Sequence, residues 1–255
     1  MKKLVVSIMA LLLCTSLFAQ VKSFADYREK KMSFYLEDDY SKVVKNIENE
    51  LSLVRANKNN YSTEEFLTYE TSLIVDSLFF NLVDNELPKN LEKKYEDLFL
   101  SQEEKCEDYM GKRKLNEFSS NFLLALADLK CQMPYVISIP KSIPKLQKAK
   151  DILEAACEKD PKNCAALMSK ALWFEYSPGI AGGSHKKALA MMEEASRLAK
   201  TNVDKFFNLM FKAQILNSLK RTDECYEAMR QAHSLYPEET FSNYLIKQLE
   251  LDIVL

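Results

Sequence analysis

Apolar side chains recur at three- and four-residue intervals along most of the chain, the spacing of one face of an α-helix. The pattern runs clearly through residues 40–54 and 66–82, and polar residues 57–60 interrupt it. Another such stretch follows Pro88, which suits the start of a helix, and stops at Gly111, which suits the end of one. The pattern therefore predicts a succession of helices and no sheet.

Local residue choices predict where some of these helices begin and where the chain leaves helical structure. Ser62 and Glu65 have the three-residue separation of a capping box before the stretch that starts near Phe66. Residues 115–131 are strongly apolar and predict a further helix. Three prolines then fall within residues 132–144, so we expect that segment not to form a regular helix.

The second half of the chain contains an internal repeat of small and large apolar residues. One set of residues is separated by four, three and five positions: Ala149, Leu153, Ala156 and Pro161. A second set has the same separations: Cys225, Met229, Ala232 and Pro237. Ala188, Met192 and Ala195 share the first two separations. A small residue at such a position lets a second helix approach closely, so the pattern predicts interlocked antiparallel helix pairs.

The segment from Tyr176 to Ser184 breaks this regularity and contains three of the four glycines of the chain. It includes Pro178, Gly179, Gly182 and Gly183, which favour non-helical backbone. We expect a protruding loop here, with Trp173 and Phe174 packing its base and Ser184 capping the next helix.

The repeated residues resemble tetratricopeptide (TPR) repeats, a family of helical hairpins of about 34 residues. The resemblance covers residues 146–239 and fades upstream, where only residues 39–51 resemble a degenerate repeat helix. It implies an all-α fold in which antiparallel hairpins stack as a solenoid, with a degenerate helical N-terminal half. The domains we expect are helical hairpins over 20–131, then TPR-like repeats and a closing helix over 132–255.

A narrower resemblance comes from the loop. A proline followed by paired glycines that open a helix, here Pro178, Gly182 and Gly183, is similar to periplasmic proteins associated with TRAP-type solute transporters. Ser184 stands where that group often has an acidic residue, so the match is incomplete. It would imply partnership with a transporter's solute-binding subunit.

In repeats of this family the first helix of each hairpin lines a concave groove. The resemblance therefore places eight residues in a candidate binding groove: Met168, Leu172, Glu175, Tyr176, Phe207, Met210, Gln214 and Asn217. Methionine, aromatic and amide side chains suit a peptide-like or apolar ligand. The alternative is that several of them pack against the N-terminal half of the chain.

Residues 1–19 have the composition of a signal peptide, with Lys2 and Lys3 before an apolar run. We expect cleavage after Ala19 and export to the periplasm or cell envelope, with no transmembrane helix in the mature chain. Lipid modification of Cys14 is the alternative, although Leu13 is larger than the residue such a site requires. Cleavage after Ala19 would remove Cys14 and leave five cysteines, of which Cys157 could meet Cys164 in a disulfide, or both could be buried thiols.

Charge and motif content narrow the chemistry further. Without the signal the chain has 33 basic and 37 acidic residues, which gives no reason to expect a nucleic-acid partner. Two histidines form no catalytic or metal-binding motif, and paired acids that are adjacent in a helix point in different directions, so we expect neither an enzyme nor a cofactor. Ser184, Lys186 and Lys187 could hold an anion at a helix start, although the glycines also suit a tight loop.

Two surface charge clusters are also visible. Lys141, Lys145, Lys148 and Lys150 with Lys186 and Lys187 could form a basic rim, and the segment 92–108 is acidic. The sequence thus predicts an exported, non-enzymatic scaffold that binds a protein, and the alternative is a carrier with a small apolar ligand in its groove.

Overall fold

The structure, a computed structural model, describes residues 23–248 of the 255-residue chain. Within that range it contains eleven α-helices joined by short connections, four of which hold single 3-10 turns. The helices are α2 (Phe24–Tyr35), α3 (Tyr40–Ala56), α4 (Thr63–Phe79), α5 (Lys89–Met110), α6 (Ser120–Cys131), α7 (Ile139–Lys159), α8 (Cys164–Tyr176), α9 (His185–Leu198), α10 (Asn202–Ser218), α11 (Thr222–Leu235) and α12 (Phe241–Gln248). The predicted signal peptide, residues 1–19, and Cys14 lie outside the described residues.

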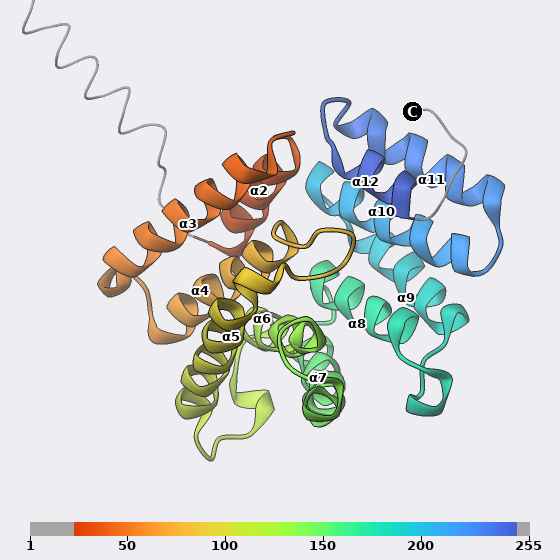
Figure 1. Ribbon diagram of the computed structural model, residues 1–255. Helices are drawn as coiled ribbons and strands as arrows, with labels where there is room; N and C mark the ends of the chain where they lie inside the picture. The colour runs from red at the N-terminus through yellow and green to blue at the C-terminus, as the bar shows by residue number, and fades with distance from the viewer. Residues whose placement is uncertain (1–22, 249–255) are drawn as a thin grey trace, which may run out of the picture.

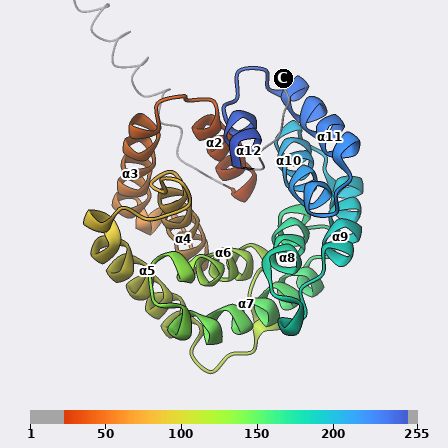
Figure 2. The same ribbon diagram turned by 45° about the vertical axis from the view of Figure 1, so that its right-hand side comes forward.

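Consecutive helices pack as antiparallel hairpins, and the hairpins stack side by side (Figure 1). The first helices of successive hairpins also pack on one another, α4 on α6, α6 on α8 and α8 on α10. These helices form the inner side of a curved array, and α5, α7, α9 and α11 lie outside them (Figure 2). The all-α hairpin architecture predicted from the sequence is confirmed.

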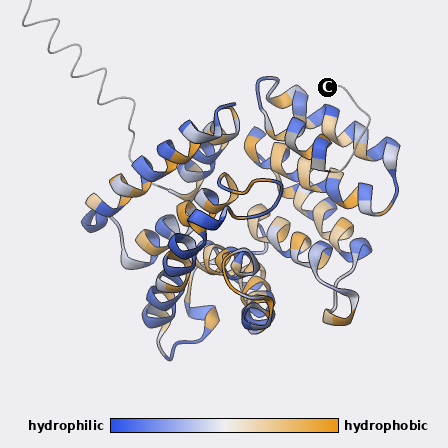
Figure 3. Ribbon diagram, viewed as in Figure 1, coloured by the Kyte–Doolittle hydropathy of each residue, from blue (hydrophilic) through white to orange (hydrophobic). Residues whose placement is uncertain are grey.

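The repeat residues lie where the outer helices meet the inner ones. Each of the nine small and large residues of the three repeat sets is completely buried: Ala149, Leu153, Ala156, Ala188, Met192, Ala195, Cys225, Met229 and Ala232. The small alanines facing them, Ala171 on α8 and Ala213 on α10, are equally buried. Figure 3 shows the same division, with apolar residues between helices and hydrophilic ones outside. Small side chains at these positions allow the close helix approach that the stack requires.

Several helix ends form as the residue types predict. The hydroxyl of Ser62 accepts a hydrogen bond from the amide of Glu65, whose carboxylate accepts one from the Ser62 amide at 2.9 Å. Pro88 immediately precedes α5, and Gly111 ends it with a φ of 55°. In these cases a side chain or a special backbone shape satisfies the free groups at the helix end.

The expectation that residues 132–144 avoid helix is wrong for their second part. Helix α7 begins at Ile139 and includes both Pro140 and Pro144. Pro140 falls in the first turn, where a missing N–H costs no hydrogen bond. Pro144 removes one interior bond, and the packing of α7 against α6 and α8 offsets this loss.

Helix α2 closes the curved array by joining its two ends. The ring of Tyr35 packs against Phe207 of α10 and Phe241 of α12, each with centroids 5.0 Å apart, and against Phe80 next to α4 at 5.1 Å. The amide of Thr240, just before α12, donates a hydrogen bond to the carbonyl oxygen of Tyr35. The solenoid therefore forms a closed ring within the described residues (Figure 2).

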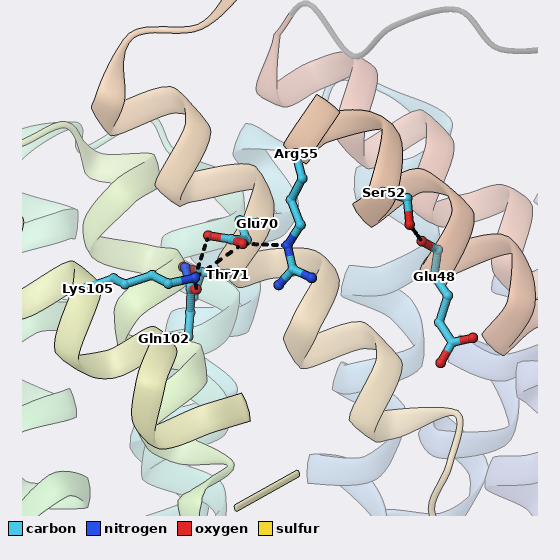
Figure 4. A network of polar contacts seen from close by, with 7 residues as sticks. All are labelled: Glu48, Ser52, Arg55, Glu70, Thr71, Gln102 and Lys105. Carbon is cyan, nitrogen blue, oxygen red and sulfur yellow. Dashed lines mark hydrogen bonds and ion pairs between the residues drawn. The ribbon is translucent and has the colours of Figure 1, made fainter. Parts of the chain in front are cut away.

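Neighbouring hairpins are connected by buried charges in addition to apolar contacts. Glu70 of α4 is buried and pairs with Arg55 of α3 at 2.7 Å and Lys105 of α5 at 3.4 Å (Figure 4). Its neighbour Thr71 accepts a hydrogen bond from Gln102 at 2.9 Å. The network fixes α5 to the hairpin before it with polar contacts, which is consistent with the mostly hydrophilic surface of that helix in Figure 3.

No helix in the described part of the chain combines the length and apolar character needed to span a bilayer. The five cysteines at positions 106, 131, 157, 164 and 225 are free thiols, so Cys157 and Cys164 are not joined. Burial raises the pKa of the Cys106, Cys164 and Cys225 thiols to about 11. They are therefore protonated at neutral pH and behave as small apolar residues.

Candidate functional site

The loop between α8 and α9 is held in one shape by its own backbone. Gly182 has a left-handed φ of 97°, a conformation that glycine adopts without steric cost. A side chain at Gly183 would overlap the carbonyl oxygen of Ser177, because the two sides of the loop touch there. The amide of Ser184 then donates to the carbonyl of Phe174 at 2.8 Å, and its hydroxyl caps α9 by accepting from the amide of Lys187.

The base of the loop is packed on α7, as the sequence predicts for Trp173 and Phe174. Trp173 is buried and donates from its ring nitrogen to the carbonyl of Leu146 at 3.3 Å. Its ring packs edge-on against Phe174 at 5.4 Å, and the ammonium of Lys150 lies 5.6 Å from the Trp173 centroid. The loop therefore projects from a packed base.

The tip of this loop presents an apolar side chain to solvent. Ile180 is fully exposed, at 101% of its reference area. Tyr176 at the end of α8 is 67% exposed, and Ile139 and Ile143 at the start of α7 are 60% and 48% exposed. Tyr135, just before α7, is also exposed.

These five residues belong to two neighbouring connections of the array. Helices α7 and α8 are adjacent and joined by a short turn, so they run antiparallel, and the start of α7 lies at the same end as the end of α8. The Trp173 contact to Leu146 agrees with this arrangement. We call the set Tyr135, Ile139, Ile143, Tyr176 and Ile180 the apolar rim. The glycines and proline of the sequence predict the loop. They do not predict the apolar rim, because its formation depends on how the α6–α7 and α8–α9 connections lie relative to each other in space.

The groove residues implied by the TPR resemblance do not line an open trough. Met168, Phe207 and Met210 are almost completely buried, and Glu175 and Gln214 are buried too. The remaining three are more accessible: Leu172 and Asn217 are half-buried, and Tyr176 is exposed.

Helix α2 is the reason that Phe207 is covered. The Tyr35 ring packs on one side of Phe207, and the guanidinium of Arg28 lies 5.7 Å from its centroid. Phe207 thus follows the alternative given for the groove residues, packing against the N-terminal half of the chain, and no local pattern in the sequence identifies α2 as the segment that covers it.

Two polar pairs connect the groove residues to the loop. The Tyr176 hydroxyl donates to the amide oxygen of Gln214 on α10. The buried carboxylate of Glu175 lies 2.9 Å from Nδ1 of His185, whose side chain is about half exposed at 51%. These contacts connect α8, α9 and α10 at the foot of the apolar rim.

The lysines at the start of α9 differ in what they face. The Lys187 ammonium lies 5.6 Å from the ring centroid of Phe174, at the base of the loop. Lys186 is exposed on the same turn. Ser184, Lys186 and Lys187 are therefore together at the start of α9, but Lys187 is directed to an aromatic ring.

The predicted basic and acidic clusters partly neutralise each other. Lys145 pairs with Glu103, and Lys148 pairs with Glu107 at 2.7 Å. Both acids also pair with Lys130, which is buried on α6. Burial raises the pKa of Glu107, but the ammonium groups of Lys130 and Lys148 outweigh this and lower it to about 2.

Two surface hollows are open to solvent and have charged residues in their walls. One of about 470 Å³ lies between the α4–α5 and α6–α7 connections and includes Glu86, Glu92, Glu96 and Tyr135. Another of about 650 Å³ is lined mainly by charged residues of α7 and the segment before α6. Among residues 23–248, no group of three or more His, Cys, Asp or Glu side chains is placed to hold a metal ion.

Comparison with known proteins supports the fold. No protein-family model matches the sequence, and a search of curated proteins finds no match. Among solved structures, the chain is similar to a thermophilic TPR protein from Thermus thermophilus, with a TM-score of 0.54 and 16% identity. The similarity covers 80% of this chain and 91% of that one. The chain therefore has a TPR-like fold.

Proposed function

We propose that this protein is an exported, non-enzymatic TPR-like scaffold that binds a partner protein through the apolar rim. The observation that carries the proposal is Ile180, fully exposed at the tip of a loop whose base is buried and whose backbone makes internal hydrogen bonds. Exposing a large apolar side chain on a projecting loop contributes nothing to folding stability, because the side chain is not removed from water. It suits a docking contact.

The surroundings of Ile180 support the same use. Tyr176, Ile139 and Ile143 are also exposed, and they lie at the end of α8 and the start of α7, at the same edge of the array as Ile180. Lys141 in α7 and Lys186 in α9 are exposed near the same helix ends, and protein interfaces commonly combine an apolar centre with a polar margin. Stacked helical repeats commonly act by presenting such extended surfaces.

For the partner we propose the solute-binding subunit of a transporter. This rests on the similarity of the Pro178–Gly183 loop to periplasmic proteins associated with TRAP-type transporters, and on the predicted signal peptide of residues 1–19. Helical repeats of this kind are scaffolds whose surfaces bind other chains, so a partner protein suits the fold better than a substrate does.

The carrier alternative receives less support. The two described hollows open to solvent and have charged residues in their walls. A small apolar ligand needs a mostly apolar, enclosed pocket. Met168, Phe207 and Met210, which would have lined such a pocket, are packed against the chain itself.

Site-specific photo-crosslinking in the host cell tests the proposal. A photoreactive residue at position 180 should give a discrete adduct with one protein, identified by mass spectrometry. The matched control is position 162, which is exposed in the turn between α7 and α8 at the opposite edge of the array. A second variant with Ile143→Asp should weaken the adduct at 180 without altering folding.

Two results would overturn the rim as the binding surface: the same adducts from positions 180 and 162, or none from position 180. Export is tested separately by the intact mass of the protein recovered from its host. Cleavage after Ala19 leaves a chain that begins at Gln20, whereas a lipid on Cys14 gives a larger mass with residues 14–19 retained.

A further inference from the structure

Helix α2 occupies the concave side of the array as a bound peptide would, and two ion pairs accompany its buried apolar contacts there. Lys31 pairs with Asp76 of α4 at 2.6 Å, and Arg28 pairs with Asp204 of α10 at 2.9 Å. Tyr27 donates its hydroxyl to the same Asp76. Three side chains of one short helix thus contact acids from two different hairpins.

A third acid lies beneath α2 beside the two that form these pairs. Asp128 of α6 accepts a hydrogen bond from Ser169 of α8 and interacts electrostatically with both Lys31 and Asp76. Burial raises the pKa of Asp128 to about 6, and the Lys31 ammonium opposes that rise. With α2 absent, the carboxylates of Asp76, Asp128 and Asp204 would line one side of the groove without cations opposite them.

An aromatic pocket adjoins these acids. Phe207, Phe241, Phe79 and Phe80 surround the Tyr35 ring at centroid distances of 5.0 to 6.0 Å. In α2 the groove therefore contacts cations at Arg28 and Lys31 and an aromatic ring at Tyr35, which follows them by two turns and one turn.

The docking of α2 also has features of an exchangeable element. The helix has 12 residues, about the length below which an isolated helix is marginal in water. The Nε atom of Arg28 is buried without a hydrogen-bond acceptor among the described residues. Only residues 36–39 connect α2 to α3, so α2 can leave the groove without disturbing the hairpin order.

We propose that this acidic and aromatic groove is a second interaction surface, which accepts a helix of a partner protein with the same arrangement of basic and aromatic side chains as α2. In the closed ring α2 occupies the groove, and the partner helix takes its place. The charge complementarity between α2 and the three aspartates defines the occupant as basic. The surface is independent of the apolar rim and of the function proposed for it.

A synthetic peptide with the sequence of residues 23–36 provides the probe. Its binding is measured by fluorescence anisotropy to the full chain and to a full-chain variant with Arg28→Glu and Lys31→Glu, which repel α2 from Asp204, Asp76 and Asp128. The peptide should bind the variant about 10-fold or more tightly than the unchanged chain, because a groove occupied by α2 is open only part of the time. A control peptide with the same two substitutions should bind neither chain, and added salt should weaken binding.

Hydrogen exchange gives a second measurement that does not depend on the variant folding. In the unchanged chain the α2 amides should exchange faster than those of α4 and α6, and adding the peptide should speed α2 exchange while α4 and α6 stay protected. Equal peptide affinity for both chains, or α2 exchange only with global unfolding, would overturn the proposal. A dimer of the unchanged chain that the peptide cannot dissociate would also overturn it, by identifying a second copy as the occupant. In each case the Ile180 crosslink remains an independent result.

Discussion

The amide of Thr240 donates a hydrogen bond of 3.0 Å to the carbonyl of Tyr35, a residue 205 positions earlier in the chain. The contact joins the end of the first described helix to the start of the last. Open arrays of helical hairpins have contacts mainly between neighbours, so their stability is close to a sum of local terms. In this chain the two ends of the array also stabilise each other.

Replacing Tyr35 with alanine should reveal how much this closure contributes. The ring is buried among four phenylalanines, so its loss should lower the free energy of unfolding by about 3 kcal/mol. Urea unfolding measures the change. Leu53→Ala, at a position that is 38% exposed, is the control and should cost much less. Equal losses in the two variants would show that Tyr35 does not hold the ring closed.

The loop before α9 should tolerate a methyl group at one glycine and not at another. A Cβ at Gly183 would lie 2.6 Å from the carbonyl carbon of Ser177, so Gly183→Ala must displace the backbone and should cost about 2 kcal/mol. Gly179 has no atom within 4 Å of such a Cβ, and Gly179→Ala should change stability little. Thermal unfolding of the Gly183→Ala and Gly179→Ala variants measures the difference. Equal melting temperatures for the two variants would show that the loop is not tightly closed.

Asp128 should make the protein less stable as the pH rises. Its pKa of about 6 in the folded chain is above the value of 3.8 expected when unfolded, so the folded state binds the proton more tightly. The contribution of Asp128 to the stability of the folded state is complete below pH 3.8 and is lost as the pH rises through about 6.

Asp128→Asn should therefore raise the free energy of unfolding by about 1–2 kcal/mol at pH 7.5 and leave it nearly unchanged below pH 4. Urea unfolding at both pH values measures the difference, with the exposed Asp151→Asn as the control. Destabilisation by Asp128→Asn at pH 7.5 would show that the ionised carboxylate is favourable, contrary to the raised pKa.

Glu107 should act in the opposite direction. Its pKa of about 2 is below the unfolded value of 4.5, so its contribution is present above pH 4.5 and is lost as the pH falls toward 2. Glu107→Gln should cost about 1 kcal/mol at pH 7, a modest loss because the side chain is 42% exposed and solvent screens its pairs. Chemical unfolding at pH 7 and pH 3 measures the loss, which should shrink at pH 3. Glu104→Gln, exposed on the same helix, should show no such pH dependence.

The sequence predicts the hairpins well because their determinants are local. Ala149, Leu153 and Ala156 repeat at a fixed spacing, and that spacing alone places them between two helices. The cap at Ser62 and the stop at Gly111 also depend only on nearby residues. The start of α7 was missed because tertiary packing on two sides outweighed the cost of Pro144.

The groove and the rim depend on contacts that no local pattern contains. Phe207 has the same helical spacing whether its face is open or covered, and α2 covers it from about 170 positions upstream. Exposure of Ile180 and Ile139 likewise depends on how two connections align in space. Residue type and periodicity indicate which side chains are apolar, but the partner of each is set by the curvature of the whole array.

Closure by Tyr35 and Thr240 also limits how such a protein can change in evolution. A linear stack lengthens or shortens by gaining or losing whole hairpins at little cost to the others. Here one added unit would separate α2 from α10 and α12, and one deleted unit would force them to overlap. Length variation in related chains should therefore concentrate in the turns and outward-facing connections, with the number of hairpins held constant.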